Sequence, residues 1–416
     1  MRRREARGGG DRGALIARLK DDGLAIGDGV DLSDGAVEQA GDEIPGLLEV
    51  LAWVPDPRRN RGRRYRLVFM LTVAVACVLA GAKNFREIGD QARDLPQDVL
   101  RRLGGQPHPL LRKIITPSEK RIRTLIHDID AGKLDELVGG WLRALADAGR
   151  LERLLTAIAI DGKWLRGVGD GQVKLFAAML HEEKVMIAQH RIPDETTETT
   201  QVKELLDGAD LEGAVVTADA AHAQRETAEY IAGSTGDGNR GSDYFLFVKG
   251  NQPGLQRAIY DAIQQDCPRE PDHVELDYGH GRIVKRSLWV ADAGDLDFPH
   301  ATQVMRIRRD GYDVTGAAIS KEIVHAVTSL DAQQAGPADM AGIARGQWGI
   351  ESVHWLRDTV YAEDANTGYA GNGPQVMATL RNMAISLLHL AGVTEITRTV
   401  QAITRDRARL LSYLPL

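Results

Sequence analysis

The order of apolar runs after residue 150 restricts the fold of this chain more than any other feature. The run LLTAIAIDGKWL predicts a strand, and KLFAAMLHEEKVMIAQHRI predicts two strands joined by a tight turn at 181–184. A helical stretch (TQVKELLDGA), a strand (GAVVTADA), a helix (AQRETAEYIAG) and a strand (DYFLFVKG) follow in that order. Three strands followed by alternating helices and strands predict an α/β fold, in which helices cover a mixed sheet.

The segments on either side of this pattern differ from it in composition and in the spacing of apolar residues. Residues 45–150 repeat apolar residues at helical spacing, which predicts an all-helical N-terminal domain. Residues 1–44 are rich in Gly, Asp and Arg, and we expect a disordered arm there. The rest, 151–400, is expected to be one domain, with a β-rich insertion of antiparallel strands at about 265–335 and helices from Asp339 onward.

Composition sets weaker limits. The sequence of 416 residues has a net charge of −7 and only two cysteines, Cys77 and Cys267, so no disulfide framework is expected and a reducing cytoplasm fits. The N-terminal MRRREARGGGDRG lacks the apolar run of a secretory signal. The longest apolar stretch, at 67–82, is shorter than the about 20 residues of a membrane helix. We therefore expect a cytoplasmic protein without membrane contact, and a buried core helix at 67–82.

Residues 58–66, RRNRGRRYR, form a dense basic cluster in an otherwise acidic chain. A cluster of this kind is either a solvated linker or a segment that binds phosphate groups, and the sequence favours neither. The loop at 236–241 fits GxGxxG literally, but it follows a helix and precedes a strand, which is the reverse of a dinucleotide site. No GxSxG motif or P-loop is present, and His222 and His280 have no partner at zinc-ligand spacing.

Two aspartates follow apolar runs in the same way. Asp161 comes after AIAI and Asp219 after AVVTA, so both carboxylates are expected at the ends of interior strands, where α/β sheets place their ligands. Burial of two ionised carboxylates is costly unless cations or hydrogen-bond donors compensate. Either residue could instead cap the turn that follows it, but the matched pair favours a functional site.

A third acid comes from the helix expected at 339–361. On a helical wheel Val353, Leu356 and Val360 share one face, whereas Glu351 points to the other side. Gln347, His354, Trp355 and Asp358 accompany it, a composition unlike an ordinary solvated face. A solvated or partner-facing helix is the alternative. Three carboxylates of this origin suit a pair of Mg²⁺ ions, which prefer oxygen ligands and promote phosphodiester cleavage and transfer.

These residues resemble the DDE transposases of bacterial insertion sequences, specifically the ISAs-type group that includes the H-repeat-associated proteins. The resemblance covers roughly residues 45–395. Its motifs occur in order at Ile160-Asp161-Gly162-Lys163, Arg166-Gly167, Thr217-Ala218-Asp219-Ala220, Lys249-Gly250-Asn251-Gln252, Gly279-His280-Gly281-Arg282, Trp348-Gly349-Ile350-Glu351, His354-Trp355 and Leu380-Arg381-Asn382. The helical segment matches through Pro55-Asp56-Pro57-Arg58, Leu79-Ala80-Gly81-Ala82 and Pro117-Ser118-Glu119.

The resemblance implies an RNase H-like core with Asp161, Asp219 and Glu351 as the catalytic, metal-binding triad, and Mg²⁺ as cofactor with Mn²⁺ as a possible substitute. Related transposases carry Tyr, Arg and Lys around the catalytic Glu, where this chain has Ala344, Gln347 and Asp358. Arg345 or Arg357 is a candidate substitute for gripping phosphate. The residues expected to bind DNA are Lys163, Arg166, Lys249, Asn251, Gln252, Arg345 and His354. For Lys249, a solvated loop lysine is an equal alternative.

The expected function follows from the resemblance. Pairs of subunits, as a homodimer on DNA, bind the terminal inverted repeats of their own element, expose a 3′-hydroxyl by hydrolysis, and join it to target DNA. The protein is expected in the bacterial cytoplasm, associated with the nucleoid. Two alternatives stay open: a metal-dependent DNA nuclease, and a catalytically silent DNA-binding protein derived from a transposase.

Overall fold

The computed structural model describes the chain in nine stretches: residues 44–60, 63–149, 155–166, 173–235, 238–239, 241–264, 270–279, 281–366 and 370–416. The expectations for the arm at 1–43, for Cys267, for His280 and for most of the loop at 236–241 lie outside these residues.

A nine-stranded sheet dominates the described part of the chain, with the strand order β3-β2-β1-β4-β7-β11-β10-β9-β8. The strands are β1 (Thr156–Leu165), β2 (Val173–Leu180), β3 (Val185–Ile192), β4 (Ala214–Ala218), β7 (Asp243–Val248), β8 (His273–Gly279), β9 (Arg282–Asp292), β10 (Gln303–Asp313) and β11 (Ala318–Thr328). A separate two-stranded sheet pairs β5 (Ser234–Thr235) with β6 (Gly238–Asn239).

The strands of the main sheet run in mixed directions. β1 pairs with β4, and β4 with β7, in parallel, as strands do when helices connect them. The connecting helices are α8 (Val202–Leu206) and α9 (Arg225–Ala232). β1, β2 and β3 are antiparallel neighbours, and residues 181–184 form the turn between β2 and β3. The prediction of a mixed α/β sheet is therefore confirmed.

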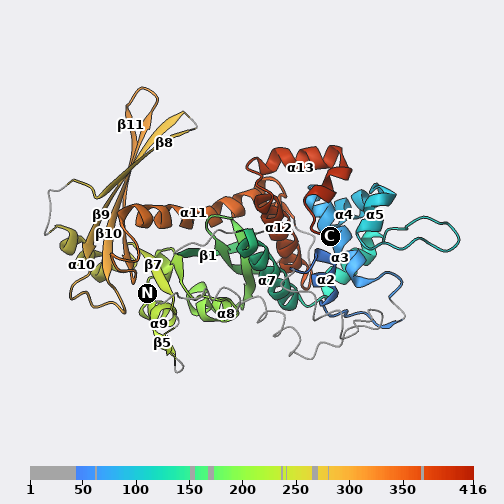
Figure 1. Cartoon of the computed structure of the whole chain (residues 1–416), viewed down its shortest axis with the longest axis horizontal. Coiled ribbons are helices and arrows are strands. Elements are labelled where there is room, and N and C mark those ends of the chain that lie inside the picture. The colour runs from blue at the N-terminus through green and yellow to red at the C-terminus, as the bar shows by residue number, and fades with distance from the viewer. Residues whose placement is uncertain are drawn as a thin grey trace, which may run out of the picture.

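The antiparallel strands β8 to β11 extend the same sheet. β11 pairs with the end of β7, where His325 lies opposite Val248 and Thr328 opposite Phe245. α10 (Pro253–Gln264) precedes these strands, and Figure 1 shows the ends of β8 and β11 projecting beyond the helices. The insertion expected from the sequence is thus continuous with the main sheet by backbone hydrogen bonds.

The residues before β1 are helical, as expected: α2 (Leu47–Ala52), α3 (Leu67–Leu79), α4 (Phe85–Arg93), α5 (Gln97–Arg102), α6 (Glu119–Asp128) and α7 (Ala131–Gly149). The helix α3 is buried along almost its whole length, which confirms the prediction of a core helix at 67–82. None of the helices in the described stretches is both long and apolar enough to span a bilayer.

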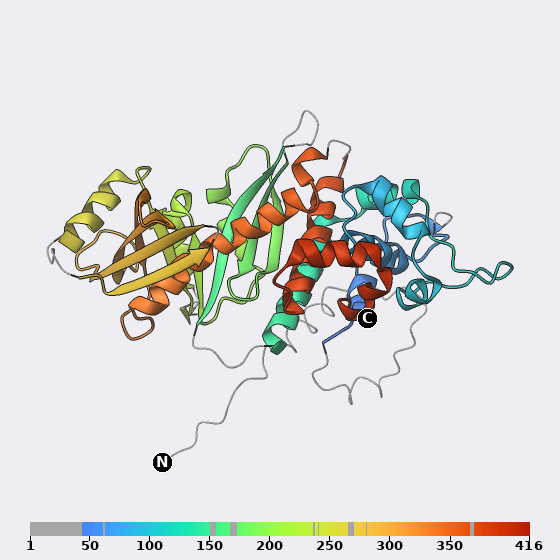
Figure 2. The same ribbon diagram turned by 90° about the horizontal axis from the view of Figure 1, so that it is seen from above.

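Three further helices follow the sheet: α11 (Pro337–Thr359), α12 (Gly373–Leu390) and α13 (Ile396–Arg405). α11, drawn in orange, crosses from the β insertion over the middle of the sheet toward α12 (Figure 2). α12 is buried on nearly every side, since it packs on α3 and α7 as well as β3. One hydrophobic core therefore joins the N-terminal helices to the sheet, and a domain boundary at residue 150 stays a prediction.

Helix α7 approaches the sheet closely at Gly139. A Cβ atom on Gly139 would lie only 2.2 Å from the carbonyl oxygen of Ile187 in β3. No side chain larger than hydrogen fits between this helix and the backbone of the strand. Gly132, in the first turn of the same helix, meets only Asp130 Oδ1 at 3.5 Å.

We expect Gly139→Ala to lower the free energy of unfolding by about 1–3 kcal/mol, because an overpacked interior must shift to admit the methyl group. Gly132→Ala is the matched control and should leave stability unchanged or slightly raised, since alanine favours helix. Urea denaturation of both variants measures the difference. Equal stabilities would show that α7 does not pack against β3 in this way.

The carboxyl group of Asp135, also in α7, is buried where α7, β3 and α12 meet. It accepts hydrogen bonds from Gln189 Nε2 at 3.1 Å, from Gln375 Nε2 at 2.8 Å and from Thr379 Oγ1. Burial raises the pKa of Asp135 from 3.8 to about 7 despite these donors. The folded state therefore favours the protonated carboxyl. The stability that this group contributes is lost as the pH rises from 3.8 to about 7.

Replacement of Asp135 by Asn should remove this dependence. Between pH 5 and 7 the unfolding free energy of wild type should fall relative to that of Asp135→Asn. Above about pH 7 the difference between the two should stay constant. Urea denaturation at several pH values measures the difference directly. A difference that does not vary with pH would contradict the raised pKa.

Candidate active site

The pairing of β1 with β4 brings the two expected aspartates together. In this parallel ladder Ile160 lies opposite Ala218, so Asp161 and Asp219 are the next residues on two strands about 4.8 Å apart. Asp219 directly follows β4, and its Oδ1 accepts a hydrogen bond from the Ala221 amide at 2.9 Å. One expectation is corrected, because β1 continues to Leu165 on the β2 side and Asp161 lies within the strand. It marks the end of the β1–β4 ladder instead.

Helix α11 is fixed to this end of the sheet by polar contacts. Gln347 Nε2 donates to the carbonyl oxygen of Ile160 at 3.1 Å, and Gln347 Oε1 accepts from Thr217 Oγ1. Thr217 also bonds His181 Nε2 at 2.9 Å. Gly346 admits His181, because a Cβ there would lie 2.0 Å from the imidazole Nδ1.

The helical wheel grouped Gln347, His354 and Asp358 with Glu351 on a face opposite Val353, and the structure turns this group toward the sheet: Gln347 contacts Ile160, His354 faces Asp161 and Asp358 pairs with Lys163. Val353, on the other side of the helix, is buried as well. The helix has two buried sides because it lies across the sheet and also meets α12. Trp355 of the same group is exposed, at 60% of its surface.

Glu351 lies one turn beyond Gln347 and is electrostatically linked to both aspartates. Partial burial raises the pKa of Glu351, and the charges of Asp161 and Asp219 raise it further, while Lys249 opposes them. Like charges in one place disfavour ionisation unless a cation compensates. The three carboxylates and Lys249 thus share one electrostatic environment.

His354, one turn after Glu351, faces Asp161. Its Nδ1 lies 3.4 Å from Asp161 Oδ2, and burial lowers the pKa of His354 despite that carboxylate. No residue in the described stretches bonds its Nε2. His354 is thus the one expected DNA-binding residue that contacts the aspartates.

The other expected DNA-binding residues have varied environments. Lys249 and Arg166 are exposed. Arg345 Nη1 pairs with Glu275 Oε2 of β8 at 3.2 Å. Asn251 Nδ2 donates to Ala220 O at 2.6 Å, and Gln252 Nε2 to Ala223 O at 3.1 Å. The last two side chains therefore hold the turn that begins at Asp219.

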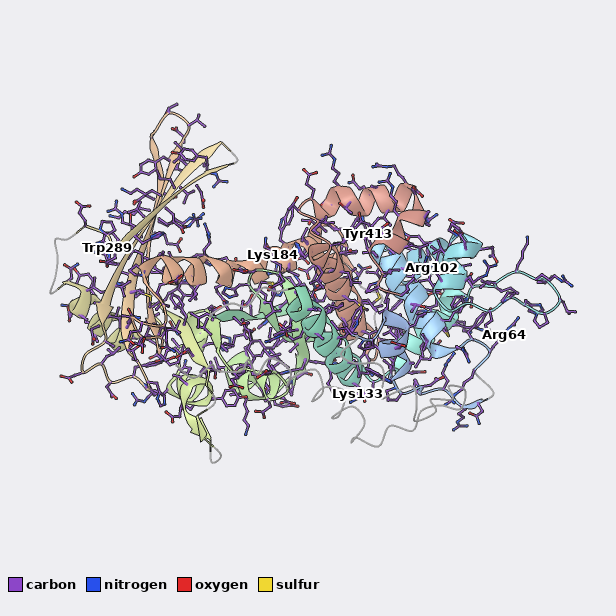
Figure 3. The ribbon with its side chains drawn as sticks, in the orientation of Figure 1. Arg64, Arg102, Lys133, Lys184, Trp289 and Tyr413 are labelled. Carbon is purple, nitrogen blue, oxygen red and sulfur yellow. The ribbon has the colours of Figure 1, made fainter. Side chains whose placement is uncertain are left out.

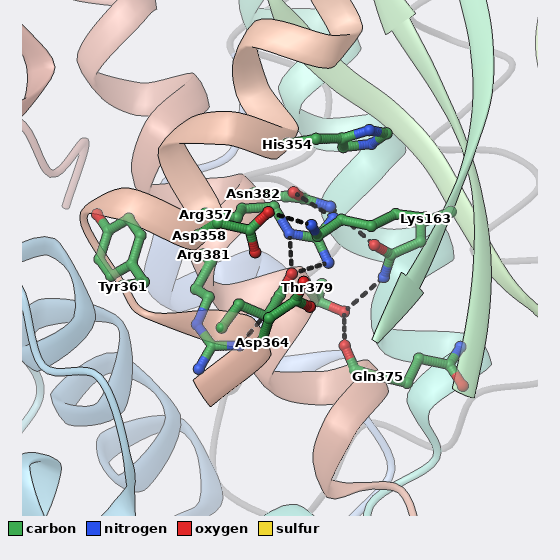
Figure 4. Close-up of polar contacts among 12 residues, drawn as sticks. Lys163, His354, Arg357, Asp358, Tyr361, Asp364, Gln375, Thr379, Arg381 and Asn382 are labelled. Atoms are coloured by element: carbon green, nitrogen blue, oxygen red, sulfur yellow. Dashed lines mark hydrogen bonds and ion pairs between the residues drawn. The ribbon is translucent and has the colours of Figure 1, made fainter. Parts of the chain in front are cut away.

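Lys163, two residues after Asp161 on β1, joins this strand to α11. Its Nζ forms an ion pair of 2.6 Å with Asp358 Oδ2 of α11, and only 9% of the lysine side chain is exposed (Figure 4). In this chain the pair connects β1 to the last turn of α11.

A buried ion cluster anchors the C-terminal end of α11. Glu363 accepts from Arg357 Nε at 2.8 Å and from Arg381 Nη1 of α12 at 2.7 Å, and all three side chains are almost fully buried. Burial alone would raise the pKa of Glu363, but the two guanidinium charges lower it to about 2. Arg357 is therefore committed to this cluster, and the expectation that it grips phosphate is wrong because no part of it is exposed.

The basic cluster at 58–66 lies elsewhere. Arg64, with Arg102, lies at the helical end of the molecule, and Trp289 of β9 lies at the opposite end (Figure 3). Arg58 is already engaged with Asp56, at 2.9 Å, and with the Tyr65 carbonyl, also at 2.9 Å. This arginine contributes to local structure, while Arg64 is exposed.

The donor chemistry of the site fits Mg²⁺, which takes oxygen ligands from a few carboxylates and keeps several waters. Burial raises the pKa of Glu351, and the charges of Asp161 and Asp219 add to this effect, as expected for carboxylates that a cation would compensate. Within the described stretches, however, no three His, Cys, Asp or Glu side chains already enclose a metal position. A fourth acid, Glu198, also lies near the aspartates, as the influence of Asp161 and Asp219 on its pKa shows. The sequence gives no signal for a role of Glu198, because the residue precedes a short helix in a Thr-rich segment with no strand pattern.

Comparison with known proteins is consistent with this arrangement. The model of a family described as Transposase DDE domain matches residues 154–387, more than half of the chain, and the model described as DDE_Tnp_1-associated matches residues 48–142. The protein is therefore of the transposase class. It belongs to the Transposase DDE domain family.

Relatives from Escherichia coli carry matching names. The H repeat-associated putative transposase YhhI of strain K12 is 25% identical over 391 residues, 89% of this chain and 98% of that protein. The putative transposase YncI of strain O157:H7 is 25% identical over 363 residues, 83% of this chain and 87% of that protein. These relatives confirm the resemblance to the H-repeat-associated group, and family membership supports a transposase function.

The buried ion cluster yields a stability test. Glu363→Gln should lower the unfolding free energy by about 3–5 kcal/mol, because it leaves two buried guanidinium groups without their carboxylate. Glu395→Gln is the control, since Glu395 pairs with Arg398 on the surface and exposed pairs contribute little. Urea denaturation compares the two. A Glu363→Gln protein as stable as the control variant would contradict the role given to the cluster.

Proposed function

We propose that this protein is the transposase of a bacterial insertion sequence, which cuts DNA at the terminal inverted repeats of its element and transfers the free 3′ end to target DNA. The observation that supports this most directly is the β1–β4 register, in which Asp161 and Asp219 follow the last ladder pair. Glu351 adds a third carboxylate, whose pKa is raised by burial and by the charges of Asp161 and Asp219. Oxygen ligands of this kind serve two-metal phosphodiester chemistry.

Asp161, Asp219 and Glu351 would hold the metal ions, with Mg²⁺ as the physiological cofactor and Mn²⁺ as a substitute. When bound, such ions activate an attacking water or 3′-hydroxyl and stabilise the leaving oxygen. The protein's own part is to fix the carboxylates. The strand register fixes two of them, and the contacts of Gln347 with Ile160 and Thr217 fix the helix that carries the third.

The fold supports the proposal that the core is RNase H-like. Strands β3, β2, β1, β4 and β7 lie in that order, with three antiparallel strands followed by two parallel ones and helices between them. The catalytic domain would span 151–400, the helical domain 45–150, and the β insertion would interrupt the core before α11. We further propose that the protein works as a homodimer on DNA in the bacterial cytoplasm, at the nucleoid.

DNA would approach from the side of the carboxylates. Lys249 and Arg166 are exposed, and Lys249 lies close enough to Glu351 to lower its pKa, so these two cations are the leading candidates to bind phosphate. His354 would act beside Asp161. Lys163, Asn251, Gln252 and Arg345 would act on DNA through the elements they hold in place, since each already has a partner in the protein.

The test is cleavage of a duplex that carries the inverted repeats flanking this gene, in Mg²⁺ or EDTA. Wild type should nick at the repeat boundary in Mg²⁺ only, and Asp219→Asn should reduce the rate at least about 100-fold, because loss even of a ligand's hydrogen-bond partner lowers metal affinity or activity by 10–100-fold. Asp295→Asn, in an exposed loop, should cut like wild type.

Other outcomes identify the alternatives. Metal-dependent cutting without preference for the repeats would indicate a nuclease. Salt-sensitive binding to the repeats without any cutting, unchanged in Asp219→Asn, would indicate a silent DNA-binding protein. Gel-shift measurements on the same proteins distinguish loss of binding from loss of chemistry.

A further inference from the structure

Glu198 opens a short 3₁₀ turn, Glu198–Thr200, after β3, and its carboxylate rests on the strand that carries Asp161. A Cβ atom on Gly162, the residue after Asp161, would lie 2.1 Å from Glu198 Oε1 and 2.6 Å from Oε2. Glycine at 162 is thus what allows a carboxylate to lie against β1 at this point.

The surroundings of Glu198 hold it in place without neutralising it fully. The Trp164 side chain and Lys174 are both near enough to favour the ionised form of Glu198. The amine of Lys174 lies 4.9 Å from the centre of the Trp164 ring. Burial and the charges of Asp161 and Asp219 nevertheless raise the pKa of Glu198. The site therefore contains a fourth acid whose charge is only partly compensated.

A buried histidine points at the same place. His222 is only 1% exposed, its ring stacks on Phe176 at 5.3 Å, and its Nε2 lies 3.9 Å from Glu198 Oε2. Neither ring nitrogen has a hydrogen-bond partner in the described part of the chain. Buried polar atoms are nearly always hydrogen-bonded in folded proteins, so an unpaired imidazole beside a carboxylate indicates that a further polar group belongs there.

Glu198 lies near enough to Asp161 and Asp219 for their charges to affect its pKa, although it approaches the sheet from another side. Successive side chains of a strand point to opposite faces, so Glu198, on the face of Gly162, approaches β1 from the side opposite Asp161. Beyond Ile160, β1 no longer has β4 beside it. Groups on either face of β1 can therefore approach its unpaired edge at the end of this ladder, beside Asp219.

We propose that Glu198 is a fourth carboxylate ligand of the divalent cation that Asp161 and Asp219 bind. This inference rests on the proposed function, since it concerns the same metal centre. Gly162 makes room for the ligand. His222, whose Nε2 lies 3.9 Å from Glu198 Oε2, would face the same cation site.

Binding of Mn²⁺ to the full-length protein tests the proposal without any reaction. Free Mn²⁺ is measured by electron paramagnetic resonance during a titration, in the presence of the duplex with the flanking repeats and with EDTA-treated protein as the start. Glu198→Gln should raise the Kd for Mn²⁺ at least about tenfold, the lower limit of what loss of a ligand's own hydrogen-bond partner does to metal affinity. Asp161→Asn should raise it by at least as much.

Two variants control the result. Glu195→Gln removes an exposed acid three residues earlier and should leave the Kd unchanged. Gly162→Ala removes no acidic residue, but its methyl group would occupy the place of the Glu198 carboxylate. It should therefore weaken Mn²⁺ binding as Glu198→Gln does. Thermal unfolding of each variant without metal shows whether its fold is intact.

The outcomes separate the two proposals. If Asp161→Asn weakens Mn²⁺ binding and Glu198→Gln does not, the role of Glu198 is wrong and the proposed function stands. If neither variant changes the Kd, or if wild type takes up no Mn²⁺, the metal centre itself is wrong and both proposals fall. A Glu195→Gln protein that loses as much affinity as Glu198→Gln would reduce the effect to general negative charge and also overturn the inference.

Discussion

The parallel register between β1 and β4 is the constraint on which the candidate site depends. Backbone hydrogen bonds set this register, with Ile160 opposite Ala218, and the alternation of side chains then puts Asp161 and Asp219 on one face. A slip of one residue would turn one carboxylate to the other face. The residues before each aspartate are fully buried, so this ladder lies within the hydrophobic core.

The position of Glu351 depends on a different kind of interaction. α11 is attached to the sheet by polar contacts: Gln347 before Glu351, His354 after it, and Lys163–Asp358 and the Glu363 cluster near its end. Buried ion pairs add little net stability, because desolvation offsets their attraction, but they are specific in geometry. A helix held by purely apolar contacts could rotate or slide at lower cost. The polar attachments thus give Glu351 a defined place relative to the aspartates.

The sequence predicted the elements well and the long-range contacts less well. Apolar periodicity located the strands β1 to β4 and β7, because each is a run of buried residues bounded by turns. It placed Asp161 at a strand end, since the apolar run stops there, but pairing with β2 carries the strand on to Leu165. The wheel of α11 grouped Gln347 and His354 with Glu351, but it did not identify what this face contacts, because polarity was the only guide. Their burial depends on partners such as Thr217 and Asp161, which are distant in sequence.

The β insertion is linked to the site more rigidly than a separate module would be. β11 hydrogen-bonds to β7, the strand that leads into Lys249, and the chain leaves β11 directly for α11. Arg345, six residues before Glu351 on that helix, pairs with Glu275 of β8 at 3.2 Å. Any displacement of the insertion must therefore either bend the sheet beside β7 or break this pair. The first change would act on Lys249 through β7, and the second on Glu351 through α11. Contacts made by the projecting strands are therefore mechanically coupled to the geometry of the site.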